Sequence, residues 1–169
     1  MVLNMILNRQ RSIRIPIQDL EKFTERARQS LRLPEDAFTI CFVTKSEIAR
    51  WNSAYRGKKG PTDVLSFRNE EAGAKPKRAK GGKTKTIPRK KNKASAAWPV
   101  SEEDGYLGDI AIAPEVARRN ARQFGRTLDD EMRILVLHGI LHLMGYDHET
   151  DMGQMDRREQ RLRRALGLA

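Results

Sequence analysis

The chain has 169 residues, the length of one ordinary domain, and this is enough to bury a hydrophobic core. Its formal net charge of +11 favours a polyanionic partner, and no stretch approaches the roughly 18 apolar residues that span a bilayer. The N-terminus lacks a secretory signal pattern, and the single cysteine, Cys41, lies in an apolar run that predicts a buried thiol. We therefore expect a soluble cytoplasmic protein with no membrane partner.

The first part of the chain alternates between strand and helix patterns. Val2–Leu7 and Ser12–Ile15 predict one strand interrupted at Asn8–Arg11, or two short strands. Apolar residues then recur at steps of three and four over Ile17–Leu33, which is typical of an amphipathic helix. Ala37–Thr44 is rich in β-branched and aromatic residues and predicts a buried strand.

A short helix, a turn and a strand are expected next. Ser46 is a plausible N-cap for a helix over Glu47–Tyr55. Two glycines and a proline make Arg56–Pro61 a turn, and Asp63–Phe67 has strand character.

Residues 69–100 break this pattern. They hold ten Lys and Arg against two Glu, and so carry +8 of the net charge of +11. Between Phe67 and Trp98 the only large apolar residue is Ile87, too little to offset the entropy of ordering the segment. We therefore expect one domain over 1–169 with a basic, disordered insertion at 69–100. The insertion is either a solvated loop without a specific task or an arm that contacts RNA.

The second part returns to regular structure. Tyr106–Ala113 predicts a strand that could form a hairpin with the strand ending at Phe67. A helix is expected over Pro114–Phe124, another from the capping residue Thr127, and a last one over Asp151–Leu168. The order β-α-β-α-β-β-α-α-α indicates an α+β domain in which helices cover a small mixed sheet of about four strands.

All three histidines of the chain lie within eleven residues, near the end of the helix that starts after Thr127. His138 and His142 are four residues apart and share one face of that helix. Gly145 is expected to end the helix in a left-handed cap, so that the chain can bring His148 back towards the other two. Three imidazoles suit one Zn²⁺ ion with a water in the fourth position. This predicts a metal site at the end of a central helix.

Other interpretations of these histidines remain. A closed structural zinc site would need a fourth ligand from Asp147, Asp151 or a distant carboxylate, and the histidines could also be unliganded core residues. Imidazoles also bind nickel, copper and iron. The spacing matches the ligand frame of metzincin proteases, but those enzymes have a Glu general base after the first histidine, where this chain has Gly139. A protease is therefore disfavoured.

The segment His138-Gly-x-x-His142-Leu-x-Gly-Tyr-Asp-His148 resembles the signature of the YbeY family of rRNA maturation factors. Three further segments are similar to that family and occur in the same order: Asn52–Gly57, Pro61–Phe67 and Leu107–Ile110. Two departures lie between the matching strands. Arg68 stands where the family usually has proline, and the basic insertion follows it.

The resemblance implies a zinc-dependent, single-strand-specific endoribonuclease that acts in 16S rRNA 3′-end maturation and ribosome quality control. Its partners would be single-stranded rRNA, the small ribosomal subunit and its assembly factors. The metal ligands would be His138, His142 and His148. The catalytic arginine of the family corresponds to Arg56, whose guanidinium could bind a phosphate bidentately.

Two other functions compete with the endoribonuclease hypothesis. One is a non-enzymatic ribosome assembly factor with a structural zinc site, and the other, less favoured, is a metalloprotease. Three acidic residues could be either partners of the site or ordinary turn residues. Asp109 and Asp63 could orient a histidine or contact substrate, and Asp147 could hydrogen-bond a histidine.

Overall fold

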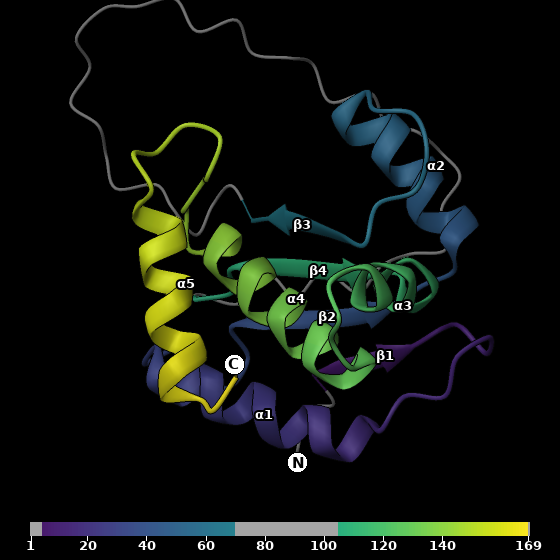
Figure 1. Cartoon of the computed structure of the whole chain (residues 1–169). Helices are drawn as coiled ribbons and strands as arrows, with labels where there is room; N and C mark the ends of the chain where they lie inside the picture. The colour runs from purple at the N-terminus through teal and green to yellow at the C-terminus, as the bar shows by residue number, and fades with distance from the viewer. Residues whose placement is uncertain (1–4, 70–104, 169) are drawn as a thin grey trace, which may run out of the picture.

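The computed structural model describes residues 5–69 and 105–168 (Figure 1). The helices and strands follow one another in the predicted order, and this confirms the α+β class. They are β1 (Ile6–Asn8), α1 (Ile17–Ser30), β2 (Phe38–Phe42), α2 (Lys45–Arg56), β3 (Val64–Arg68), β4 (Gly108–Ile112), α3 (Pro114–Gln123), α4 (Leu128–Leu143) and α5 (Gln154–Ala165). No helix in these described ranges is long and apolar enough to cross a membrane.

The four strands form one mixed sheet in the order β1-β2-β4-β3. The strands β1, β2 and β4 are parallel, whereas β3 runs antiparallel to β4. The β3–β4 pair is the predicted hairpin, with Ser66 opposite Ile110. Beyond the last strand residues, the backbone N–H of Asn69 still donates to the carbonyl of Leu107 at 2.7 Å. The pairing therefore continues to the point where the basic segment leaves the described residues.

Both faces of the sheet are covered. Side chains alternate across each strand, so that Ile40 and Ile110 join the core under α1, α4 and α5, whereas Cys41 and Ala111 join a smaller core under α2 and α3. Figure 1 shows α4 crossing one face of the sheet with α1 and α5 beside it. Cys41 is completely buried, as predicted.

Helix α4 is the central helix of the domain. The Thr127 hydroxyl accepts from the N–H of Asp130 at 3.1 Å, so the predicted N-cap is confirmed. The helix is apolar on most of its circumference, and residues such as Leu137 and Leu141 have no exposed surface. A helix buried on several sides is a rigid support for any group that it carries.

Two local predictions are wrong. Ser12–Ile15 is not a strand, although Ile13 is buried, because the Gln10 side chain bonds both the N–H and the carbonyl of Ile13 in place of a neighbouring strand. The N-cap of α2 is Thr44 and not Ser46. The predicted strand residues 2–4 and almost all of the basic insertion lie outside the described residues.

Candidate metal centre

The last turns of α4 and the loop after it bring the three histidines together. The ring centroids of His138 and His142 are 4.7 Å apart, as expected for an i, i+4 pair. Gly145 has a φ of +97°, a left-handed conformation that reverses the chain. The ring centroid of His148 lies 5.4 Å from that of His138 and 5.3 Å from that of His142. One ligand nitrogen from each ring lies within 4.8 Å of the others.

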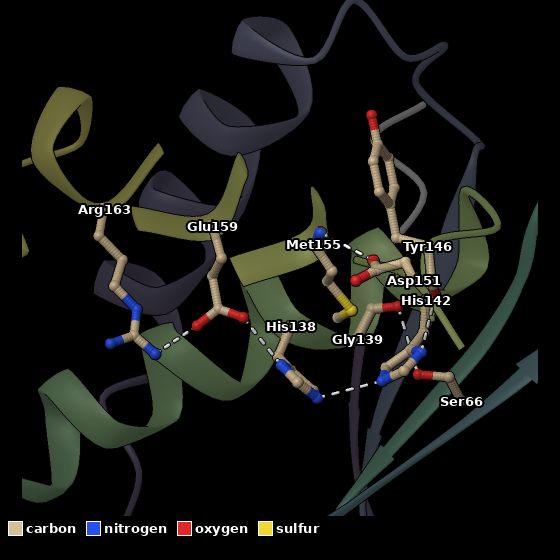
Figure 2. A network of polar contacts seen from close by, with 9 residues as sticks. All are labelled: Ser66, His138, Gly139, His142, Tyr146, Asp151, Met155, Glu159 and Arg163. Atoms are coloured by element: carbon tan, nitrogen blue, oxygen red, sulfur yellow. Dashed lines mark hydrogen bonds and ion pairs between the residues drawn. The ribbon is translucent and has the colours of Figure 1, made fainter. Parts of the chain in front are cut away.

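Each helical histidine is held through its Nδ1 atom (Figure 2). The Nδ1 of His138 donates to the carboxylate of Glu159 at 2.8 Å, and the other carboxylate oxygen of Glu159 accepts from Arg163. The Nδ1 of His142 donates to the backbone carbonyl of Tyr146 at 3.0 Å. The two Nε2 atoms point toward each other and lie 3.1 Å apart.

The pKa values of His142 and Glu159 are shifted in the directions that metal binding needs. Burial lowers the pKa of His142 below its ordinary value, and the neighbouring His138 and His148 lower it further. His142 is therefore a neutral imidazole at neutral pH. Burial alone would raise the pKa of Glu159, but the hydrogen bond from His138 and the charge of Arg163 outweigh it, so the net shift is downward. Glu159 is thus an ionised acceptor that orients His138.

The donor set fits a tetrahedral metal ion such as Zn²⁺. Zinc–nitrogen bonds of about 2.0–2.1 Å in a tetrahedron place the nitrogens roughly 3.3 Å apart, and the two helical Nε2 atoms are 3.1 Å apart. Within residues 5–69 and 105–168, the three histidines are the complete cluster of His, Cys, Asp and Glu at such spacing. The arrangement thus supplies three imidazole donors and leaves one coordination position for water or substrate.

The two nearby aspartates, Asp147 and Asp151, accept hydrogen bonds from backbone N–H groups and do not join the histidine cluster. Asp147 accepts from the N–H of Glu149 at 3.0 Å and from the Thr150 hydroxyl at 3.1 Å. Asp151 accepts from the first N–H groups of α5, among them that of Met155 at 2.8 Å. The turn-residue interpretation of Asp147 therefore fits its contacts, and neither carboxylate supplies a fourth ligand in the cluster.

The two strand aspartates also have structural partners. Asp63 accepts from the N–H of Val64 at 2.9 Å and from the Asn120 side chain at 3.0 Å, which joins the start of β3 to α3. Asp109 is buried and accepts from the hydroxyl of Tyr106. Burial and this hydrogen bond raise the pKa of Tyr106 above its ordinary value, so it remains a donor.

The histidines line an open pocket of about 630 Å³ that also contains Arg56. Arg56 is the last residue of α2, and Gly57 ends the helix with a φ of +65°. The guanidinium of Arg56 lies 3.5 Å from the carboxylate of Glu149, the residue directly after His148. The structure therefore brings Arg56 and all three predicted ligands to the same pocket, although Arg56 lies 82 positions before His138 in the sequence.

Three further residues of the site were missed in the sequence. Tyr55 and Arg68 line the pocket, and Glu159 holds His138. The guanidinium of Arg68 lies over Gly145, where a Cβ atom would come within 3.2 Å of it. A signal for Glu159 was present, because it occupies the apolar stripe of α5 between Met155 and Leu162, where an unpaired carboxylate would be costly.

Gly139 lies away from the pocket and faces the sheet. A Cβ atom at this position would lie 2.8 Å from a methyl carbon of Ile110, and the carbonyl of Gly139 accepts from the Ser66 hydroxyl at 3.2 Å. Any side chain here would be directed into the packing between α4 and β4. The geometry therefore strengthens the argument against a protease, because the residue that occupies the place of the protease base faces the sheet and not the pocket.

The fold and the site define a small α+β protein with a three-histidine centre in an open pocket that two arginines line. The family model described as Endoribonuclease YbeY matches residues 5–167, and the chain belongs to this family. Similar proteins called Endoribonuclease YbeY come from Nautilia profundicola (37% identity, covering 80% of this chain and 76% of the relative) and from a Sulfurovum species (32%, covering 96% and 90%). A solution structure of a Thermotoga maritima protein is 27% identical, with a TM-score of 0.54, and the match covers 95% of this chain and 87% of that one.

Proposed function

We propose that this chain is a metal-dependent endoribonuclease that cleaves single-stranded RNA. The observation that carries the proposal is one open pocket that combines three convergent imidazoles with the guanidinium groups of Arg56 and Arg68. Phosphodiester cleavage needs a metal or base at the reacting atoms and cations for the phosphate charge. The names of the relatives, Endoribonuclease YbeY, support the same reaction.

The proposed metal is one Zn²⁺ ion held by His138, His142 and His148. When bound, the ion would supply Lewis acidity and lower the pKa of a coordinated water towards about 7. Glu159 and the carbonyl of Tyr146 fix the Nδ1 protons of His138 and His142, so that both rings present Nε2 to the ion.

The proposed catalytic role of Arg56 is to bind the scissile phosphate and stabilise the charge that develops during cleavage. A guanidinium can do this through two parallel hydrogen bonds. Glu149 lies 3.5 Å from Arg56 and 3.7 Å from Lys58, and 58% of its side chain is exposed. Exposed ion pairs are weak, about 0–1 kcal/mol, so a phosphate can displace Glu149 at little cost.

The proposed biological substrate is rRNA, with action at the 3′ end of 16S rRNA and in quality control of the small ribosomal subunit in the cytoplasm. A single domain with a basic insertion at 69–100 is part of the same proposal. The +8 charge of that segment would attract the RNA backbone. Deletion of residues 70–98 should weaken RNA binding and flatten its salt dependence while the metal content stays intact. An unchanged salt slope would leave the segment without this role.

The decisive experiment measures metal content and cleavage of a defined single-stranded RNA on the same preparations. His142→Ala should lose both the metal and cleavage. Arg56→Ala should keep the metal and the fold but lose cleavage, whereas Arg50→Ala, an exposed arginine of the same helix, should change neither. Metal-free His142→Ala protein that cut RNA at the wild-type rate would end the proposal. Ribosome binding without cleavage by any variant, wild type included, would favour the assembly factor.

A further inference from the structure

Tyr55 is an exposed aromatic residue on the wall of the metal pocket. It lies in the last turn of α2, one residue before Arg56, and 72% of it is accessible to solvent. Two other large hydrophobic residues in the described ranges, Phe124 and Met152, are also exposed, but neither lines this pocket. A single exposed aromatic residue is ordinary on a protein surface. Its position beside the histidines and Arg56 is what suggests a ligand.

The ring of Tyr55 is held in place from behind. It contacts the ring of Phe67 edge-on, with centroids 5.1 Å apart and an interplanar angle of 75°. Phe67 contacts Trp51 in turn at 6.0 Å and 85°. Such edge-to-face pairs are favourable and stabilise this arrangement of the rings. The aromatic row Trp51–Phe67–Tyr55 therefore presents a positioned ring with most of its surface free.

We propose that Tyr55 stacks on an unpaired nucleobase of the RNA strand next to the phosphate bound by Arg56. The inference rests on the proposed RNA substrate and adds the group that would select for single strands. A base inside a duplex already stacks on its neighbours, whereas an unpaired base can stack on an aromatic side chain. Stacking is tolerant of sequence, because every base has a π-face. Tyr55 thus gives a preference for single strands with little preference for sequence.

The guanidinium groups of the pocket favour RNA over a protein partner as the ligand of Tyr55. The pocket also contains carboxylates, but those of Asp63 and Asp147 accept hydrogen bonds from neighbouring residues, and Glu149 pairs with Arg56. Arg56 and Arg68 line the same pocket, and Arg68 has no ion-pair partner among the described residues. An unpaired guanidinium, together with one held only by a weak exposed ion pair, beside an exposed aromatic ring matches the backbone and bases of a single strand. A protein partner at Tyr55 would leave RNA binding unchanged in a Tyr55 variant, so the test separates the two.

The first test compares Tyr55→Ala, Tyr55→Phe and Phe124→Ala in cleavage and in anisotropy titrations of a labelled single-stranded RNA. Tyr55→Ala should lower affinity and kcat/KM by about 5- to 150-fold, the effect of losing one base–aromatic stack. Tyr55→Phe keeps the ring and should stay near wild type. Phe124→Ala removes another exposed ring, which lies outside the pocket, and should have no effect. Metal content should be unchanged in all three. The melting temperature should fall slightly in Tyr55→Ala, which loses the ring contact with Phe67, and binding is therefore measured well below that temperature.

The second test identifies the stacked base. Bases of the oligonucleotide are replaced one at a time by abasic sites, and by 2-aminopurine, whose fluorescence is quenched by stacking. At one position the abasic substrate should weaken wild type and Tyr55→Phe but not weaken Tyr55→Ala further, and 2-aminopurine there should be quenched only when a ring is present. The stacking proposal would be overturned if abasic substitution weakened binding by Tyr55→Ala as much as binding by wild type at every position. It would also be overturned if Tyr55→Ala bound the intact RNA as tightly as wild type. Base-dependent binding without cleavage would instead overturn the nuclease proposal and leave the stacking intact.

Discussion

Glu159 accepts a hydrogen bond from His138 across 21 residues of sequence, at 2.8 Å. The two residues lie on different helices, so this contact couples the packing of α5 against α4 to the orientation of one imidazole. Glu159 in turn is held by Arg163, one turn further along α5 (Figure 2). Helix α5 therefore supports the candidate metal centre, although it contributes none of the three histidines.

Removal of the Glu159 carboxylate should weaken metal binding. We expect Glu159→Ala to lower Zn²⁺ affinity by about 10- to 100-fold, the usual effect of losing the partner of a ligand histidine. Glu159→Gln keeps an acceptor for His138 but loses the charge, and it should lie between Ala and wild type. Competition with a fluorescent chelator measures the affinity. Asp156→Asn, an exposed carboxylate of the same helix, is the matched control. Equal affinities for wild type and Glu159→Ala would mean that His138 needs no such support.

Arg68 should contribute to RNA binding and not to metal binding. Arg68→Gln should raise KM for single-stranded RNA about tenfold, because a phosphate contact contributes about 1.5–3 kcal/mol when charge-assisted and part of it is recovered by the amide. The salt dependence of log K should become shallower by about 0.7 per lost phosphate contact on a single strand. Arg118→Gln, an exposed arginine of α3 outside the pocket, should change neither. A KM equal to wild type would show that Arg68 does not contact the substrate.

Gly139→Ala should destabilise the fold. The new Cβ atom would meet Ile110 at 2.8 Å, and overpacking of this kind costs about 1–3 kcal/mol, from which about 1 kcal/mol is recovered by better helix propensity. Urea denaturation should therefore show a loss of up to about 2 kcal/mol. Ile110→Val in the same background removes one of the clashing carbons and should cost less than the sum of the two single changes. A more stable Gly139→Ala protein would show that α4 can move away from β4 freely.

Cys41 should be unreactive in the folded protein. Burial raises the pKa of its thiol to about 12, against about 8.5 for an exposed cysteine. At pH 8 a thiol reagent should react quickly only in denaturant. The higher folded pKa favours the protonated thiol, so its contribution to the free energy of unfolding is complete below about pH 8.5 and declines as the pH rises towards 12. Cys41→Ala should be less stable at pH 7 but should lack this part of the decline. Identical pH profiles would contradict the shift.

The order of helices and strands could be predicted because an element that is buried on one or two faces has apolar residues at regular intervals in its sequence. Apolar residues at steps of three and four identified α1, and the β-branched run identified β2. The prediction for Ser12–Ile15 was wrong although Ile13 is buried, because the side chain of Gln10 satisfies its backbone and no periodic signal reports such a contact. The N-cap of α2 was misplaced by two residues. Thr44 and Glu47 form a capping box, and the spacing of a threonine and a glutamate three residues apart is itself a sequence signal for this N-cap.

The metal-ligand candidates were visible because they are local. His138, His142 and His148 lie within one helix end and its loop, where spacing alone fixes their proximity. Glu159 and Arg68 come close to the histidines only through the packing of separate helices and strands. Residue spacing along the chain cannot predict such contacts. Arg56 was found only through the family resemblance.

The backbone contacts at the base of the β3–β4 connection have a consequence for chain length. Asn69 and Leu107 are joined by a backbone hydrogen bond, and the Asn69 side chain donates to the carbonyl of Tyr106 at 3.2 Å. These contacts join the two described ends of the hairpin connection. Each doubling of a connecting loop adds only about 0.6 kcal/mol of closure entropy. The connection is therefore a permissive insertion point, at which homologues can gain or lose sequence, or an engineer can add a tag, without altering the geometry of the histidines.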